Sequence, residues 1–253
     1  MLTADCRSRR APTAPHWTVS QGPLNIAPAS IFPSLEQLSL HNLEALPWVH
    51  FLALNKQGAS RKDSTSVARP TNVRDMLKTL EYPKGTNADS RLLSSLVNFR
   101  NLVIVNVYAH CSRGGGCLFR LTDDGIENLA VTLPHLKTLR LGNLCRSNIC
   151  KTTVTSLMSI SVNCLDLEVL ETHFNTQTIT GDMQRLLDDG TGRERTKCKL
   201  QNLFIGGIPL ELRREEVETV AAGFKVIFPC LTHFPSRIFS GSWPHVQLKL
   251  SEY

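Results

Sequence analysis

Residues 121–144 read LTDDGIENLAVTLPHLKTLRLGNL, and the first half of this stretch has the pattern of a surface helix. Thr122 is a suitable helix N-cap, and Asp123 and Asp124 place negative charge at the helix N-terminus, where the helix dipole favours it. Apolar residues follow at helical spacing: Ile126, Leu129, Ala130 and Leu133. The stretch therefore begins with a helix that has one apolar face.

The second half of the stretch changes to the pattern of a strand. Pro134 ends the helix, because the residue before a proline is disfavoured in the α region. Leu136, Leu139 and Leu141 then form L-x-x-L-x-L, which places Leu139 and Leu141 on one face of a short strand. Neither element can bury its apolar face alone, but a stack of such units can.

The strand pattern recurs along the chain. It begins 34, 31, 33 and 31 residues apart, at Leu102, Leu136, Leu167, Leu200 and, in a degraded form, Leu231. Residues 35–40 (LEQLSL) match it as well, 67 residues before Leu102, which is about two periods. This recurrence predicts an α/β leucine-rich repeat solenoid, a horseshoe with an inner parallel β-sheet and outer helices, of about five to six units.

The repeats suggest three parts. Residues 1–30 contain four prolines and no periodicity, and predict a disordered or loosely ordered leader. The repeat domain spans 31–234, with an insertion at about 55–89, in which Met76–Tyr82 is too short to assign as a strand or a helix. Residues 235–253 form either the C-terminal cap that a solenoid needs or a tail.

Further helices are expected between the strands. One follows Thr152 as its N-cap, and another is stopped by Gly190 in the C′ position. The predicted ranges are Leu43–Leu54, Ser90–Phe99, the helix after Thr152, Ile179–Leu187 and Glu211–Phe224.

Alternation along the strands identifies the side chains that would form the concave face. They are Gln37, Ser39, His41, Ile104, Asn106, Tyr108, Thr138, Arg140, Val169, Glu171, His173, Asn202 and Phe204. These residues are either solvated sheet positions or a partner-binding surface. Apolar groups across neighbouring strands (Ile104, Tyr108, Val169 and Phe204) favour a protein-binding surface.

The sequence contains no motif of catalysis. It has no phosphate-binding G-x-x-x-x-G-K-[ST] loop, no G-x-S-x-G elbow and no H-E-x-x-H. We therefore expect neither an enzyme nor a cofactor. The formal net charge of +6 is spread over the chain, so solvated loops explain its basic stretches more simply than nucleic-acid binding does.

Several patterns bear on the compartment. No run of about 18 apolar residues predicts a membrane span, and the N-terminal residues lack the apolar core of a secretory signal. The sequence has eight cysteines and no Asn-x-Ser/Thr sequon. These features favour reduced thiols in a cytoplasmic or nuclear protein.

One cysteine-rich group follows two adjacent strands. His110, Cys111 and Cys117 come after the Leu102 strand, and Cys145 and Cys150 come after the next one. Parallel neighbours would bring both loops to one edge of the sheet, where His and Cys side chains are ligands for zinc. The C-x5-C and C-x4-C spacings are wider than those of a zinc knuckle, so loop or buried thiols are the simpler interpretation, and metal or a disulfide is the alternative.

Four segments together resemble the leucine-rich repeat region of fungal (basidiomycete) F-box proteins. They are FPSLEQLSLHNL (32–43), LTDDGIENLAVTLPHLKTLRLG (121–142), CLDLEVLETHFNT (164–176) and VIFPCLTHF (226–234). The resemblance implies a substrate receptor of a ubiquitin ligase: the repeats bind a protein substrate, and an F-box docks on a cullin-ligase adaptor.

This sequence departs from that family in two ways. The stretch before Leu35 is too short and proline-rich to resemble an F-box, so adaptor docking is assigned to no residue here and would require an F-box elsewhere. The asparagine or cysteine that closes the strand consensus is matched by Asn175 but by no residue of the other repeats. The alternative function is that of a scaffolding repeat protein without a ligase link.

Overall fold

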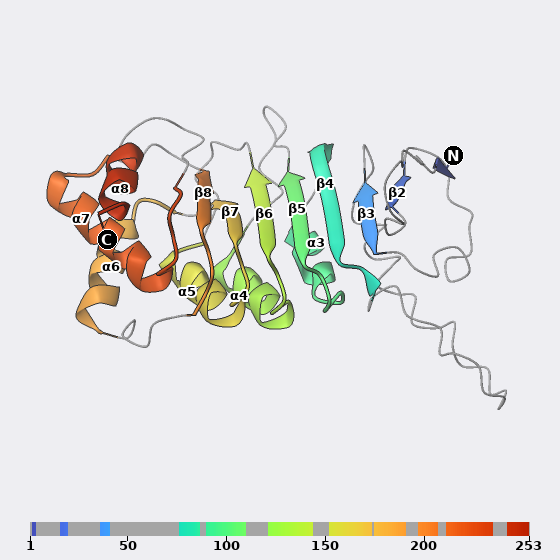
Figure 1. Cartoon of the computed structure of the whole chain (residues 1–253), viewed down its shortest axis with the longest axis horizontal. Coiled ribbons are helices and arrows are strands. Elements are labelled where there is room, and N and C mark those ends of the chain that lie inside the picture. Colours follow the sequence, from blue (N-terminus) through green and yellow to red (C-terminus); the bar gives the residue numbers. More distant parts are fainter. Residues whose placement is uncertain are drawn as a thin grey trace.

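The strands of the chain form one sheet in which spatial order follows chain order. The computed structural model describes residues 2–3, 16–19, 36–40, 76–86, 90–109, 121–143, 152–173, 175–190, 197–206, 211–234 and 242–252. The described strands lie side by side from the N-terminal to the C-terminal end of the molecule (Figure 1).

The sheet has eight described strands. They are β1 (Leu2–Thr3), β2 (His16–Val19), β3 (Gln37–Leu40), β4 (Thr79–Thr86), β5 (Ile104–Ala109), β6 (Thr138–Asn143), β7 (Val169–His173) and β8 (Asn202–Gly206). Only β1 and β2 are antiparallel, and every other neighbouring pair is parallel. A parallel neighbour requires the chain to return to the same end of the sheet, and from β4 to β8 each connection contains one described helix.

The helices connect and flank the later strands. They are α3 (Ser90–Leu96), α4 (Asp123–Thr132), α5 (Val154–Asn163), α6 (Ile179–Asp188), α7 (Arg214–Ile227) and α8 (Trp243–Leu250). As the 121–144 pattern predicts, the Thr122 side chain accepts a hydrogen bond from the Gly125 amide and caps α4. Gly190 follows the C-cap of α6 with φ 60°, the left-handed conformation that a helix C′ glycine adopts.

The leucines of the strand pattern form the core. Leu102, Leu136, Leu167, Leu200 and Leu231, which begin the predicted repeats, are all fully buried. In-register strand residues pack beside them: Leu38, Leu80, Val105, Leu139, Leu170 and Leu203. Burying a side chain of this size contributes about 1.5–3 kcal/mol, so each unit is stabilised mainly by its own leucines and those of its neighbours.

The backbone joins successive units in the same way each time. The amide of Lys137 donates to the carbonyl of Val103, that of Glu168 to Lys137, and that of Gln201 to Glu168. The chain is thus a solenoid-like α/β stack, in which one strand and one helix recur in register.

Two described strands lie within segments that the sequence analysis assigned to a leader and to an insertion. Residues 16–19 of the predicted leader form β2, and residues 79–86 of the predicted insertion form β4. Each pairs in parallel with β3, at Trp17 to Leu38 and at Leu38 to Leu80. The other residues of 1–30 and the predicted helix Leu43–Leu54 lie outside the described residues.

The N-cap of α5 is Thr153 rather than Thr152. The Thr153 side chain accepts from the Thr155 amide. The buried Thr152 hydroxyl instead donates to the His173 carbonyl at 2.5 Å. Either threonine suits a cap, and this contact with the end of β7 decides between them.

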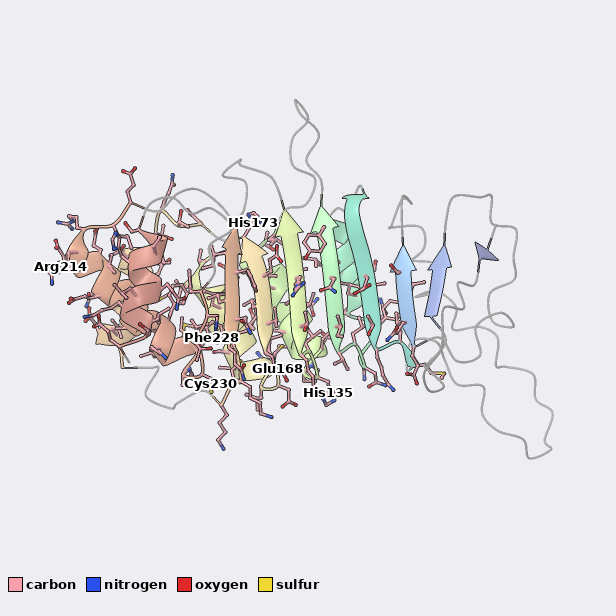
Figure 2. All side chains as sticks on the ribbon, turned by 45° about the horizontal axis from the view of Figure 1, so that its top comes forward. His135, Glu168, His173, Arg214, Phe228 and Cys230 are labelled. Carbon is pink, nitrogen blue, oxygen red and sulfur yellow. The ribbon has the colours of Figure 1, made fainter. Side chains whose placement is uncertain are left out.

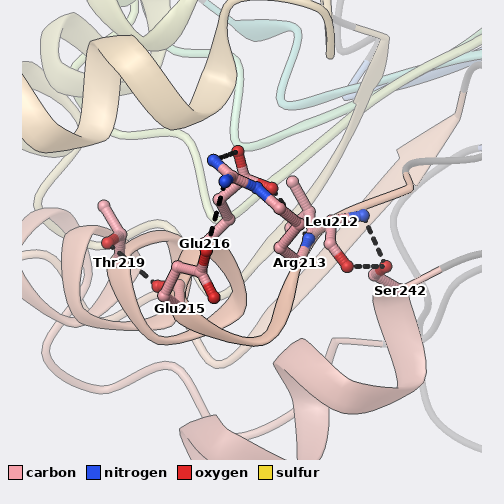
Figure 3. A network of polar contacts seen from close by, with 6 residues as sticks. All are labelled: Leu212, Arg213, Glu215, Glu216, Thr219 and Ser242. Atoms are coloured by element: carbon pink, nitrogen blue, oxygen red, sulfur yellow. Dashed lines mark hydrogen bonds and ion pairs between the residues drawn. The ribbon is translucent and has the colours of Figure 1, made fainter.

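Helix α7 begins at Arg214, three residues later than predicted. Glu216 accepts from the Arg213 backbone amide at 2.7 Å and from its guanidinium at 3.1 Å, which fixes the first turn (Figure 3). The preceding residue is held to the start of α8, because the Leu212 amide donates to Ser242 Oγ at 2.7 Å. Residues 211–213 therefore contact the start of α8 and do not form the first turn of α7.

The C-terminal segment includes a helix packed on the last described unit. Val246 and Leu250 of α8 are buried, and the Lys249 ammonium lies 3.6 Å from Glu218 of α7. Beyond β8, Thr232–Phe234 continue the sheet, and the Gln247 side chain bonds both their exposed backbone groups: it accepts from the Phe234 amide and donates to the Thr232 carbonyl. Helix α8 thus occupies the place of a cap.

Within the described ranges, none of the helices combines the length and the apolar composition that crossing a membrane requires.

Candidate protein-recognition surface

The side chains on the face of the sheet opposite the buried leucines line up in rows. One row consists of Gln37, Thr79, Ile104, Thr138, Val169 and Asn202, and the next of Ser39, Glu81, Asn106, Arg140, Glu171 and Phe204. Tyr108 and His173 stand beyond these rows, near the ends of their strands. We call this set of fourteen side chains the open face.

The open face contains every described residue that the sequence assigned to the concave face; His41 lies outside the described residues. Most of these side chains are half-buried rather than exposed. Ser39, Glu171 and His173 are buried, at 3%, 4% and 7% exposure. Their position on the face is as predicted, but these three contribute little accessible surface.

Thr79 and Glu81 belong to the open face although sequence reasoning did not name them. They lie on β4, inside the predicted insertion. The signal was present: Leu77, Leu80 and Tyr82 repeat the L-x-x-L-x-L spacing with an aromatic residue last, and both leucines are buried.

Polar side chains cross the middle of the face from strand to strand. Asn106 Nδ2 donates to Glu81 Oε1 at 3.0 Å. The Tyr108 hydroxyl donates to Glu171 Oε2 at 3.4 Å, two strands away. The Tyr108 ring reaches that far because Gly142 lies beneath it; a Cβ at Gly142 would stand 2.4 Å from Tyr108 Cδ1.

Two atoms at the centre of the face differ from the rest. Arg140 Nε and Asn106 Oδ1 are buried and, among the described residues, have no hydrogen-bond partner. The two residues are register partners on β5 and β6. Most buried polar atoms of folded proteins are hydrogen-bonded, so two orphans side by side require an explanation.

The apolar members of the face are Ile104, Val169 and Phe204, with the Tyr108 ring. All four are half-buried, so the open face exposes less apolar surface than the sequence suggests. The exposed large hydrophobics of the described residues lie elsewhere: Val131 on α4, Val162 on α5, Leu165 in the turn after α5, and Leu248 on α8. The open face is therefore mixed in character, as protein interfaces of the non-obligate kind are.

The two ends of the strands carry different side chains. Figure 2 shows His173 at the C-terminal end of β7, and His135, Glu168 and Cys230 at the opposite end of the strands. At that same end of the strands the Lys199 ammonium lies 2.7 Å from the Asp166 carboxylate. A hydrogen bond from Lys199 holds the pKa of the Asp166 carboxyl below its usual value.

The proposed metal ligands cannot be placed. His110, Cys111, Cys117, Cys145 and Cys150 all lie outside the described residues. Within the described ranges no three His, Cys, Asp or Glu side chains gather closely enough to hold a metal ion.

Two described cysteines have a structural role instead. Cys164 Sγ donates to the carbonyls of Ala130 and Leu133 at 3.6 Å each, and Cys198 Sγ donates to the Cys164 carbonyl at 3.4 Å. Burial, reinforced by Cys198, raises the pKa of the Cys164 thiol to about 12, and burial raises the pKa of Cys198 to about 11. Both stay protonated near neutral pH and link one repeat to the repeat before it.

No protein-family model matches this sequence, and a search of the curated proteins finds no match for it.

Proposed function

We propose that this chain is a leucine-rich repeat module that binds a partner protein on the open face, as the substrate-binding part of an F-box-type ubiquitin ligase receptor. The partner is a protein substrate, and a cullin-ligase adaptor joins the complex if an F-box exists elsewhere. The module acts by binding, without a catalytic residue or a cofactor, in the cytoplasm or nucleus.

The observation that carries this proposal is the open face itself. One side of the sheet packs into the core through its leucines, while the other presents half-buried apolar, amide and charged side chains in register. A row-by-row surface of this kind suits a partner that lies across several strands. The resemblance of four segments to F-box repeat proteins supports the ligase role in particular.

Two matched variants test the binding face. The face variant is Tyr108→Ala/Phe204→Ala, and the helix variant is Val131→Ala/Val162→Ala. The second pair is 57% and 62% exposed on α4 and α5, where alanine is a good helix former. Both remove apolar side-chain surface at different places, and the face variant also removes two aromatic rings and the hydrogen bond from Tyr108 to Glu171, so circular dichroism checks that its fold is intact.

The experiment is capture of partners from a fungal lysate, followed by binding of the identified partner to each purified variant. We expect the face variant to lose at least ten-fold in affinity and the helix variant to match the wild type. Equal loss in both variants, or loss in the helix variant alone, contradicts the assignment. A partner set without cullin adaptor leaves face recognition standing but replaces the ligase role with scaffolding.

A further inference from the structure

Asn106 and Arg140 form a specific pair of unused hydrogen-bonding atoms at the centre of the open face. Parallel neighbouring strands lie about 4.8 Å apart, and these two residues are directly in register on β5 and β6. Asn106 Oδ1 can only accept and Arg140 Nε can only donate. Both atoms are buried and unpaired among the described residues.

The orientation of the Asn106 amide is fixed by its other neighbour. Glu81 Oε1 accepts the hydrogen bond from Asn106 Nδ2 at 3.0 Å, and a carboxylate can only accept. The Asn106 nitrogen is therefore held toward β4. Its oxygen accepts no hydrogen bond among the described residues.

We propose that Asn106 and Arg140 together receive the side-chain carboxamide of an asparagine or glutamine of the partner protein, its oxygen on Arg140 Nε and its nitrogen on Asn106 Oδ1. This rests on the proposed function and names the chemistry that the open face recognises. A carboxamide carries one acceptor and one donor a short distance apart, so it satisfies both orphan atoms at once.

Charged groups of the partner fit this position less well. A carboxylate offers no donor to Asn106, and it would lie between two carboxylates of the same row, Glu81 beside Asn106 and Glu171 beside Arg140. An ammonium or guanidinium offers no acceptor to Arg140. Either charge would leave one buried atom unpaired, and an unpaired buried group is costly.

The burial of Arg140 Nε and Asn106 Oδ1 favours a side chain of the partner over its backbone as the group that binds them. The two atoms are covered, while the residues that carry them are half-buried. A carboxamide at the end of a side chain is narrower than a peptide group with a Cα on each side, so it suits a covered position better.

The test uses the full chain and a displayed library of random twelve-residue peptides, with selected binders measured by fluorescence anisotropy. Arg140→Lys keeps the charge but removes the Nε donor. Arg214→Lys, at an exposed position of α7 outside the open face, is the matched control. In the best binder each Asn or Gln is replaced in turn by leucine or methionine, by the corresponding acid, and by serine.

We expect one carboxamide position whose replacement by any of these weakens binding roughly 10- to 100-fold, the size of a hydrogen bond to a charged group. In Arg140→Lys the wild-type peptide should lose a similar factor, and the carboxamide replacement should then cost little more. The Arg214→Lys control should bind normally. Circular dichroism of each variant checks that its fold is intact.

Other outcomes overturn the inference. Binders without a carboxamide position sensitive to Arg140, tighter binding by the acid, or equal binding by the serine peptide each identify a different chemistry. The face variant separates this failure from failure of the proposed function. Binders that lose affinity with the face variant but ignore Arg140→Lys leave face recognition intact, whereas recovery of no binder sensitive to the face variant overturns both.

Discussion

At the scale of single residues, contacts between successive repeats decide what a side chain does. Asp123 illustrates this. The sequence places it in the first turn of α4, where it suits the helix dipole. The structure shows that its carboxylate also accepts from the backbone and side chain of Thr153, at 2.8 and 2.9 Å, and from the Ser156 hydroxyl. Asp123 thus caps the helix of the next repeat, which no local pattern reveals.

The role of Asp123 predicts an asymmetry with its neighbour. Asp123→Ala removes three hydrogen bonds that anchor α5, and we expect it to lower the free energy of unfolding by about 2–3 kcal/mol. Asp124→Ala removes an exposed carboxylate from the same helical turn and should cost only about 0.3–1 kcal/mol. Urea unfolding measures both. Equal losses would mean that Asp123 acts only through the dipole of its own helix.

The buried thiols predict a pH dependence of stability. The pKa of Cys164 is about 12 in the folded chain and about 8.5 in an unfolded one. Above about pH 8.5 the unfolded thiol loses its proton while the folded thiol keeps it, so the folded state binds more protons and stability falls as pH rises.

Between pH 9 and 10.5 the wild type should therefore lose about 1.4 kcal/mol per pH unit more than Cys164→Ala. Other groups titrate in this window too, and the comparison with the variant cancels them. Unfolding curves at three pH values suffice. Parallel stability profiles for the two proteins would show that the Cys164 thiol ionises as easily in the folded state as in the unfolded one.

At the scale of elements, sequence periodicity predicts strands and helices where the pattern is long enough. The strands β5 to β8 and the helices α4 and α6 lie at or within about three residues of their predicted positions. Periodicity does not decide Met76–Tyr82, where β4 begins, because the segment is too short, and it predicts a leader where residues 16–19 form β2. Pairing with β3 compensates for weak local preference in both strands.

Helix α8 gives a prediction about the end of the sheet. Gln247 bonds the Phe234 amide and the Thr232 carbonyl, as a further strand would. We expect Gln247→Ala to lower the free energy of unfolding by about 1–2 kcal/mol and to speed hydrogen exchange at the Phe234 amide.

Leu248→Ala is the control for this prediction. It alters an exposed residue of the same helix and should leave both quantities unchanged. If exchange at Phe234 is unaffected in Gln247→Ala, then α8 packs on α7 without closing the sheet edge.

At the scale of the whole molecule, the sequence predicts which residues share a face, but it does not predict which side chains on that face contact one another or are buried. Alternation correctly assigns Asn106, Arg140 and Glu171 to one side of their strands. It does not give the hydrogen bonds from Asn106 to Glu81 or from Tyr108 to Glu171, because both depend on register between strands far apart in the chain. Nor does it show that Ser39, Glu171 and His173 are covered, since burial depends on neighbouring rows.

The central claim is that a partner protein binds the open face. Hydroxyl-radical footprinting of the chain alone and in complex with its captured partner tests this directly, because oxidation reports the accessibility of individual side chains. We predict that oxidation of Tyr108 and Phe204 falls in the complex, while that of Leu165 and His135, away from the open face, stays unchanged. Protection of Leu165 and His135 with undiminished oxidation of Tyr108 and Phe204 would contradict the claim.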